Sequence, residues 1–198
     1  IPIYNTSHIF GFFTSFTPNA ISDFTLYKSN FPTQYGGRLS SVFDVRAKKG
    51  NNQEFSMRGG ISPITADVLV EGPISKGKSS YMAGVRTTYS DWVLNSINVP
   101  ELNESSAQFR DAISTLNIHL GKNDRLNITG YYSYDDVSLS SLTNNKYQNL
   151  GSSVEWTHVI GNKHSLETIG SYSSYAYDED NLQSFNAEYT IDYQIQHS

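Results

Sequence analysis

The sequence predicts an all-β chain that contributes long antiparallel strands to a membrane barrel, preceded by a short region of mixed α+β character. Three observations predict this fold class. Apolar and polar residues alternate with a period of two, most clearly in residues 185–195, and this is the period of a strand rather than of a helix. The connections between such stretches alternate between short and long. Tyrosine is abundant, with 14 residues, whereas charged residues make up only 17%, below the roughly 25% of soluble domains.

The composition excludes several functional classes. The 198 residues include 14 basic and 19 acidic ones, with a formal net charge of −5, so we expect no nucleic-acid partner, which would need a basic face. The chain has no cysteine, which excludes disulfides, thiolate zinc sites and cysteine nucleophiles. It lacks the ~20 consecutive apolar residues of a membrane-spanning helix, but a membrane-spanning strand needs only ~9–11 residues of alternating polarity.

Residues 1–50 have the texture of a small mixed domain. Thr17 and Pro18 predict a helix start, with Thr17 at the N-cap and Pro18 at the first helical position, where its missing N–H costs nothing. The helix must be short, because residues 24–27 already alternate as a strand. A turn at Gly36-Gly37 precedes a second strand over residues 39–45.

Residues 51–198 predict eight strands with no helix between them. On the last strand, Tyr189, Ile191 and Tyr193 are expected to face lipid, and Glu188, Thr190 and Asp192 the lumen. The eight strands are expected over residues 54–61, 64–71, 81–90, 114–120, 126–135, 150–160, 166–177 and 185–195.

The connections support a barrel. Residues 73–78, 121–124 and 161–164 form short turns, whereas residues 92–108 and 139–148 are long and polar, as in outer-membrane barrels. A soluble β-sandwich also alternates, but its strands usually have only ~5–6 residues.

A string of motifs in the first ninety residues then indicates a family. Residues 2–5, 7–13, 20–28 and 31–46, followed by Glu71-Gly72-Pro73-Ile74, resemble TonB-dependent outer-membrane receptors, most of all the non-SusC type of Bacteroidetes. By this resemblance, residues 1–50 are the C-terminal half of a plug domain. By the same resemblance, residues 51–198 form about eight antiparallel strands, and these are the first strands of a barrel of about 22 strands. The chain lacks the first half of the plug and the TonB box, so we expect a fragment or a mature product.

The resemblance implies energised import of a nutrient across the outer membrane of a Gram-negative bacterium. The ligand would be a siderophore, cobalamin, a glycan or a peptide, bound by plug apices and outer loops. The implied partners are outer-membrane lipid, the TonB-ExbB-ExbD motor, engaged through the missing N-terminal region, and a surface lipoprotein. No cofactor and no covalent chemistry are expected.

Two groups of candidate residues follow. The aromatic loop of residues 7–13 could contact ligand through His8, Phe10, Phe12 and Phe13, although the same side chains could pack the plug core. Contacts between plug and wall are expected from Arg38, Arg86 and Glu155. A wider set of polar residues is expected to line the lumen: Asp67, Glu71, Asn117, His119 and Asn127.

No metal or catalytic site is predicted. The five histidines show no ligand spacing such as H-x-x-x-H, and no G-x-S-x-G, P-loop or acid-pair motif occurs. An outer-membrane enzyme is therefore disfavoured. A small self-contained eight-stranded barrel with a structural or adhesive role stays open as an alternative, but its lumen would be filled by its own side chains.

Overall fold

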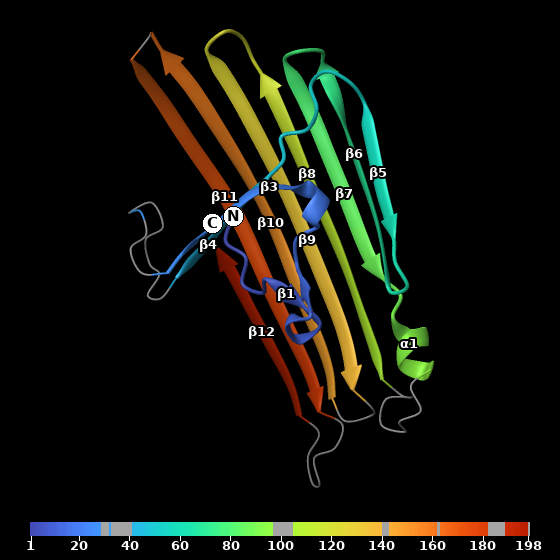
Figure 1. The fold of residues 1–198 in the computed structure, drawn as a ribbon. Coiled ribbons are helices and arrows are strands. Elements are labelled where there is room, and N and C mark those ends of the chain that lie inside the picture. Colours follow the sequence, from blue (N-terminus) through green and yellow to red (C-terminus); the bar gives the residue numbers. More distant parts are fainter. Residues whose placement is uncertain are drawn as a thin grey trace.

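The computed structural model describes residues 1–28, 32, 41–96, 105–139, 143–161, 163–181 and 189–197. It is mostly antiparallel β-structure. Eight strands lie side by side in one sheet in the order β12-β11-β10-β9-β8-β7-β6-β5, so every strand pairs with its neighbour in sequence (Figure 1). Among the described strands, β5 and β12 lie at opposite edges and do not pair with each other. The sheet is therefore open.

The strands agree with the prediction in number and order, and β6 and β8 to β11 are longer than predicted. Their bounds are β5 Ser56–Ile61, β6 Thr65–Ser75, β7 Ser79–Thr88, β8 Ser106–His119, β9 Asp124–Leu139, β10 Thr143–Ile160, β11 His164–Asn181 and β12 Tyr189–His197. Two stretches expected to be loops, residues 92–108 and 139–148, belong in part to strands β8, β9 and β10. The expectation of no helix is wrong, because α1 (Asp91–Ser96) lies between β7 and β8.

The N-terminal residues form small elements that lie against one face of the sheet (Figure 1). A first hairpin pairs β1 (Ser7–His8) with β2 (Phe13–Thr14) around the 3-10 turn η1 (Ile9–Gly11). A second pairs β3 (Ile21–Tyr27) with β4 (Val42–Ala47). We call residues 1–28 and 41–50 the N-terminal segment.

The predicted helix at Thr17 is a single 3-10 turn, η2 (Pro18–Ala20). Thr17 precedes this turn as expected, but its side chain makes no capping hydrogen bond. The reason is length: β3 begins directly after Ala20, and the Ala20 amide already bonds to the Thr17 carbonyl. The turn at residues 36–37 lies outside the described residues.

The strand register defines two faces of the sheet. The segment face carries the N-terminal segment, and its middle row runs across β6 to β10 through Asp67, Arg86, Asp111, Ser133 and Asn149. On this face Leu69, Met82, Ile113 and Tyr131 form an apolar core with Phe16 and Ala20 of the segment. The predicted lumen residues Asp67, Glu71, Asn117, His119 and Asn127 lie on the segment face by register.

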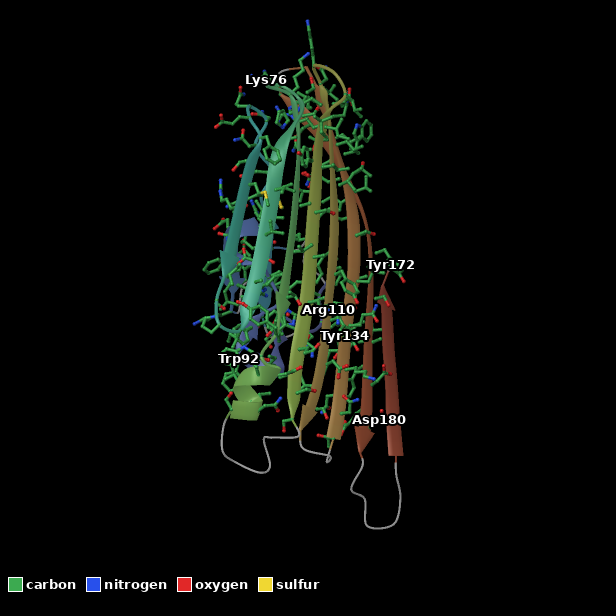
Figure 2. All side chains as sticks on the ribbon, turned by 90° about the vertical axis from the view of Figure 1, so that its right-hand side faces the viewer. Lys76, Trp92, Arg110, Tyr134, Tyr172 and Asp180 are labelled. Atoms are coloured by element: carbon green, nitrogen blue, oxygen red, sulfur yellow. The ribbon has the colours of Figure 1, made fainter. Side chains whose placement is uncertain are left out.

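The opposite face, called the outer face, carries no other element of the described chain. Its exposed side chains over the turn-proximal part are largely apolar, including Val85, Leu116, Leu150, Val154 and Leu166. Lys76 lies at the end of the sheet where the turns are short, and Trp92 and Asp180 lie toward the opposite end. Arg110 and Tyr134 lie between these two ends (Figure 2). No helix among the described residues is long and apolar enough to cross a membrane.

The expected facing of the last strand is wrong. The backbone register pairs Tyr193 with Tyr177 and Ile191 with Glu179. Tyr177 and Glu179 share a face with Tyr175, whose ring lies 5.9 Å from that of Tyr4 in the N-terminal segment. The positions expected to face lipid are thus in register with the segment face. Period-two alternation alone divides a strand into two faces without saying which face is covered.

Candidate functional site

The contact between the N-terminal segment and the eight-stranded sheet, called the wall below, centres on a buried ionic cluster. Four charged side chains meet there: His8 from the segment, Arg86 from β7, Asp111 from β8 and Asp135 from β9. Neighbouring strands bring Arg86, Asp111 and Asp135 together. Arg86 pairs directly with Asp111, and Asp135 pairs with Phe109, which lies two residues before Asp111 on β8. All four residues are buried.

His8 bridges the two carboxylates. Its Nδ1 lies 2.7 Å from Oδ2 of Asp135 and its Nε2 lies 3.2 Å from Oδ1 of Asp111. The imidazole is 0% exposed. A carboxylate oxygen accepts hydrogen bonds, so both ring nitrogens can donate at once only when the ring is an imidazolium. Asp135 also accepts a hydrogen bond of 3.2 Å from the Ile9 amide.

Arg86 completes the cluster from the wall. Its Nε donates to Oδ2 of Asp111 at 2.6 Å, and its Nη2 donates to the Thr14 carbonyl of the segment at 2.5 Å. The guanidinium lies 4.9 Å from the centroid of the Phe109 ring. His8 stacks on that same ring at 4.2 Å with an interplanar angle of 6°. Phe109 therefore supports both cations, an arrangement that favours their charged forms.

The electrostatics of the cluster favour a charged His8. Burial by itself lowers the pKa of His8, but the hydrogen bonds and negative charges of Asp111 and Asp135 outweigh it and raise the pKa above its ordinary value of 6.5. Two carboxylates, one guanidinium and one imidazolium sum to zero charge. Buried charges are tolerated when they are paired and hydrogen-bonded in this way.

Around the cluster, wall side chains hold backbone atoms of the segment. Tyr131 donates to the Ser15 carbonyl at 2.9 Å. Thr115 and Ser80 each donate at 2.7 Å to consecutive carbonyls at residues 48 and 49. Asn149 donates to the Asn5 carbonyl at 3.3 Å. Most of these contacts replace hydrogen bonds to water, so each contributes only about 0.5–1.5 kcal/mol.

The aromatic loop only partly matches its predicted ligand-contact role. His8 is buried in the cluster and has no free nitrogen, so it is not an accessible contact residue. The Phe13 ring packs 5.3 Å from Phe109. Phe12 is 82% exposed and is the member of the loop that could meet a ligand. The side chain of Phe10 lies outside the described residues.

The loop turns sharply at Ile9, whose φ of 48° is positive. A β-branched residue rarely adopts this conformation, which costs free energy and persists only where its surroundings impose it. Here the neighbouring His8 and the Ile9 amide are both bound to Asp135. The wall carboxylate thus fixes the shape of the loop.

The predicted contacts between segment and wall have different outcomes. Arg86 lies against the segment and binds it. Glu155 occupies the same face, opposite Asn127 and Ile169, but no hydrogen bond or ion pair joins it to the described part of the N-terminal segment. Arg38 lies outside the described residues.

Sequence reasoning missed the two aspartates that receive His8. Their signal was present: Asp111 stands between Phe109 and Ile113 on an alternating strand, and an acidic residue among apolar residues of one face needs a partner. What the pattern lacked was the identity of that partner, which is more than a hundred residues away.

Among the residues that the structure describes, no group of three or more His, Asp or Glu is arranged to hold a metal ion. Comparison of the chain with protein-family models, with curated proteins and with solved structures gives no match.

Proposed function

We propose that this chain is part of a TonB-dependent outer-membrane receptor that imports a nutrient. In this proposal the N-terminal segment is the second half of the plug and β5–β12 are part of the barrel wall. The observation that carries the proposal is the ionic cluster of His8, Arg86, Asp111 and Asp135. It attaches a separate segment to one face of a long-stranded sheet whose other face is largely apolar near the short turns.

The open edges of the sheet support a larger wall. Unpaired strand edges in lipid would leave backbone N–H and C=O groups unsatisfied, at several kcal/mol each. Since β5 and β12 do not pair with each other, further strands would have to continue the sheet. A self-contained eight-stranded barrel, the alternative considered from the sequence, would require that pairing. No observation favours it.

The chemistry of the contact suits a plug that stays in place and can still be displaced. Hydrogen bonds and ion pairs exchange readily with water once water enters, because the net free energy of each is small. A purely apolar contact would instead resist hydration over its whole area. The apolar part of this contact is formed by Phe16 and Ala20 of the segment on Leu69, Met82, Ile113 and Tyr131, with Ile3, Ile21, Val45 and Ala47 packed around them. The ionic cluster and the hydrogen bonds to segment carbonyls make up the rest of the contact.

The test uses a cysteine placed beneath the segment. Residue Ser133 is 1% exposed on the segment face and receives a hydrogen bond from Asn149, and the sequence contains no native cysteine. The complete protein carrying Ser133→Cys is produced in its host, and growing cells are treated with a membrane-impermeant maleimide. Asn95→Cys on the exposed end of α1 serves as the control for accessibility.

The proposal expects the protein in the outer-membrane fraction and labelling of the Ser133→Cys variant that depends on the motor. This labelling should fall severalfold in cells lacking TonB or treated with a protonophore, while the Asn95→Cys variant is labelled equally in all cells. Equal labelling of the Ser133→Cys variant with and without the motor, or recovery of the protein in another fraction, would overturn the proposed function.

A further inference from the structure

The charge of the buried cluster depends on a single proton. The cluster contains one guanidinium and two carboxylates, so with these groups charged it is neutral only when His8 is protonated. With a neutral imidazole, one ring nitrogen would present a lone pair to a carboxylate oxygen. One of the contacts at 2.7 Å and 3.2 Å would then become repulsive, and the buried site would carry a net charge of −1.

We propose that the N-terminal segment docks onto the wall with uptake of one proton by His8, and that alkaline conditions therefore loosen the segment. This inference rests on the proposed function and adds a regulatory property to the same contact. The segment supplies the imidazolium, and β8 and β9 supply the two carboxylates that receive it. Undocking returns His8 to water, where above its ordinary pKa it releases the proton.

No other group facing His8 can take over this role at moderate pH. From β7 the facing group is Arg86, from β8 Asp111 and the ring of Phe109, and from β9 Asp135. The first hairpin adds the ring of Phe13, which packs on Phe109. The aspartates already bear the charge that the proton compensates, and the remaining facing groups are aromatic rings or a permanent cation. The proton on the imidazole decides whether both ring nitrogens can donate to the two carboxylates.

The direction of the pH effect follows from linkage. The docked state raises the pKa of His8 above 6.5, so the docked state binds more protons than the undocked one. The stabilisation is fully present below pH 6.5, declines as the pH rises above this value, and is lost above the docked pKa. Between these two pKa values the ratio of undocked to docked protein rises by up to tenfold per pH unit, because one proton is exchanged.

The experiment measures docking without requiring a ligand. The complete protein carrying Ser133→Cys, purified in detergent, is labelled with a maleimide from pH 6 to pH 9, and rates are divided by those of the exposed Asn95→Cys at each pH. This ratio removes the intrinsic pH dependence of thiol reactivity. The proposal expects the ratio to rise by up to tenfold per pH unit above pH 6.5.

Two variants assign the effect. His8→Gln cannot titrate, so the ratio should be higher at pH 6 and independent of pH. His158→Gln is the matched control, because His158 also pairs with an aspartate, Asp124, at 2.8 Å, but does so near the turns and away from the segment; its profile should equal that of the parent. Asp135→Asn removes one carboxylate and lowers the pKa of docked His8, so the rise should still begin near pH 6.5 but end at a lower pH and be smaller in total.

A ratio that does not change with pH in the parent, or that still changes in His8→Gln, would overturn the inference. Motor-dependent labelling of the Ser133→Cys variant in cells together with a flat pH profile would reject the proton uptake and leave the proposed function standing. A pH-dependent profile that vanishes in His8→Gln, together with labelling in cells that is independent of the motor, would support the proton uptake and reject the proposed function.

Discussion

The sharpest test of the membrane assignment compares two neighbouring positions of the same strand pair. On the outer face of β10 the stretch from Leu150 to Ile160 is mostly apolar, with Ser152 and His158 as its polar members, whereas Lys146 and Gln148 precede it. Ten residue steps at ~3.4 Å span about 34 Å along the strand, or about 26 Å along the membrane normal at a tilt of ~40°. This matches the ~25 Å apolar band of outer-membrane barrels. Val154 lies near the middle of that band.

The perturbation is an arginine on either face at this level. Val154 is 46% exposed on the outer face and pairs with Gly170, whereas Ile169 is 62% exposed on the segment face and pairs with Glu155 in the adjacent row. Val154→Arg should cost about 2–4 kcal/mol, because the midplane of the bilayer cannot solvate a cation. Ile169→Arg should cost far less, since it would meet water and the Glu155 carboxylate.

The assay is the urea dependence of folding for the complete protein in lipid vesicles, followed by tryptophan fluorescence and by heat-modifiable migration in gels. In a water-soluble sheet both substitutions would be nearly neutral, because both side chains are already about half exposed. Equal costs for the two variants, or a harmless Val154→Arg, would refute the reasoning that the outer face meets lipid.

Three further predictions follow from the contact between segment and wall and from the connections. Asp111→Asn should destabilise docking of the segment by about 3–5 kcal/mol, because it leaves Arg86 as an uncompensated buried cation and removes one of the two carboxylates that bind His8. Limited proteolysis of the segment should reveal this while far-UV circular dichroism stays that of a sheet. Gly50→Ala should cost at least about 1–2 kcal/mol in thermal unfolding, because Gly50 has a φ of 84° and an added Cβ would overlap the Tyr81 carbonyl. An epitope tag after Asn103 should be reached by antibody on intact cells and one after Asn123 should not, and the reverse labelling would invert the topology.

The strands could be predicted because alternation is a local property. In β9 the alternation over residues 126–135 is clear, in β11 the alternation over residues 166–177 is weaker, and the structure extends both strands at both ends. The extensions were missed where polar residues occupy both faces, as in residues 143–149 of β10. There, alternation carries no hydrophobic contrast, although the backbone still pairs with β9 and β11.

Of the four residues of the ionic cluster, the sequence singled out the two basic ones and missed the two aspartates. Arg86 stood out as a charge on an otherwise mixed strand, and His8 as a polar residue in an aromatic loop. Their shared partner Asp111 could not be assigned, because pairing across more than a hundred residues depends on how the segment crosses the sheet. The same limit explains the reversed facing of β12: alternation gives two faces, and only tertiary contacts decide which one is covered.

The described part of the chain buries an unusually large share of polar and charged side chains. Among the described residues, 16 polar or charged residues are buried, against 9 hydrophobic ones, whereas soluble proteins bury mainly hydrophobic residues. In β8 the covered row holds Asp111 and Thr115 beside Phe109 and Ile113, and the uncovered row holds Ala112 and Leu116 beside Arg110 and Ser114. Buried charges beneath the segment and an exposed apolar stretch near the short turns are both unfavourable in water. They become favourable when lipid covers the apolar stretch and the charges neutralise one another, and this is the physical argument behind the proposal that the sheet lies in a membrane.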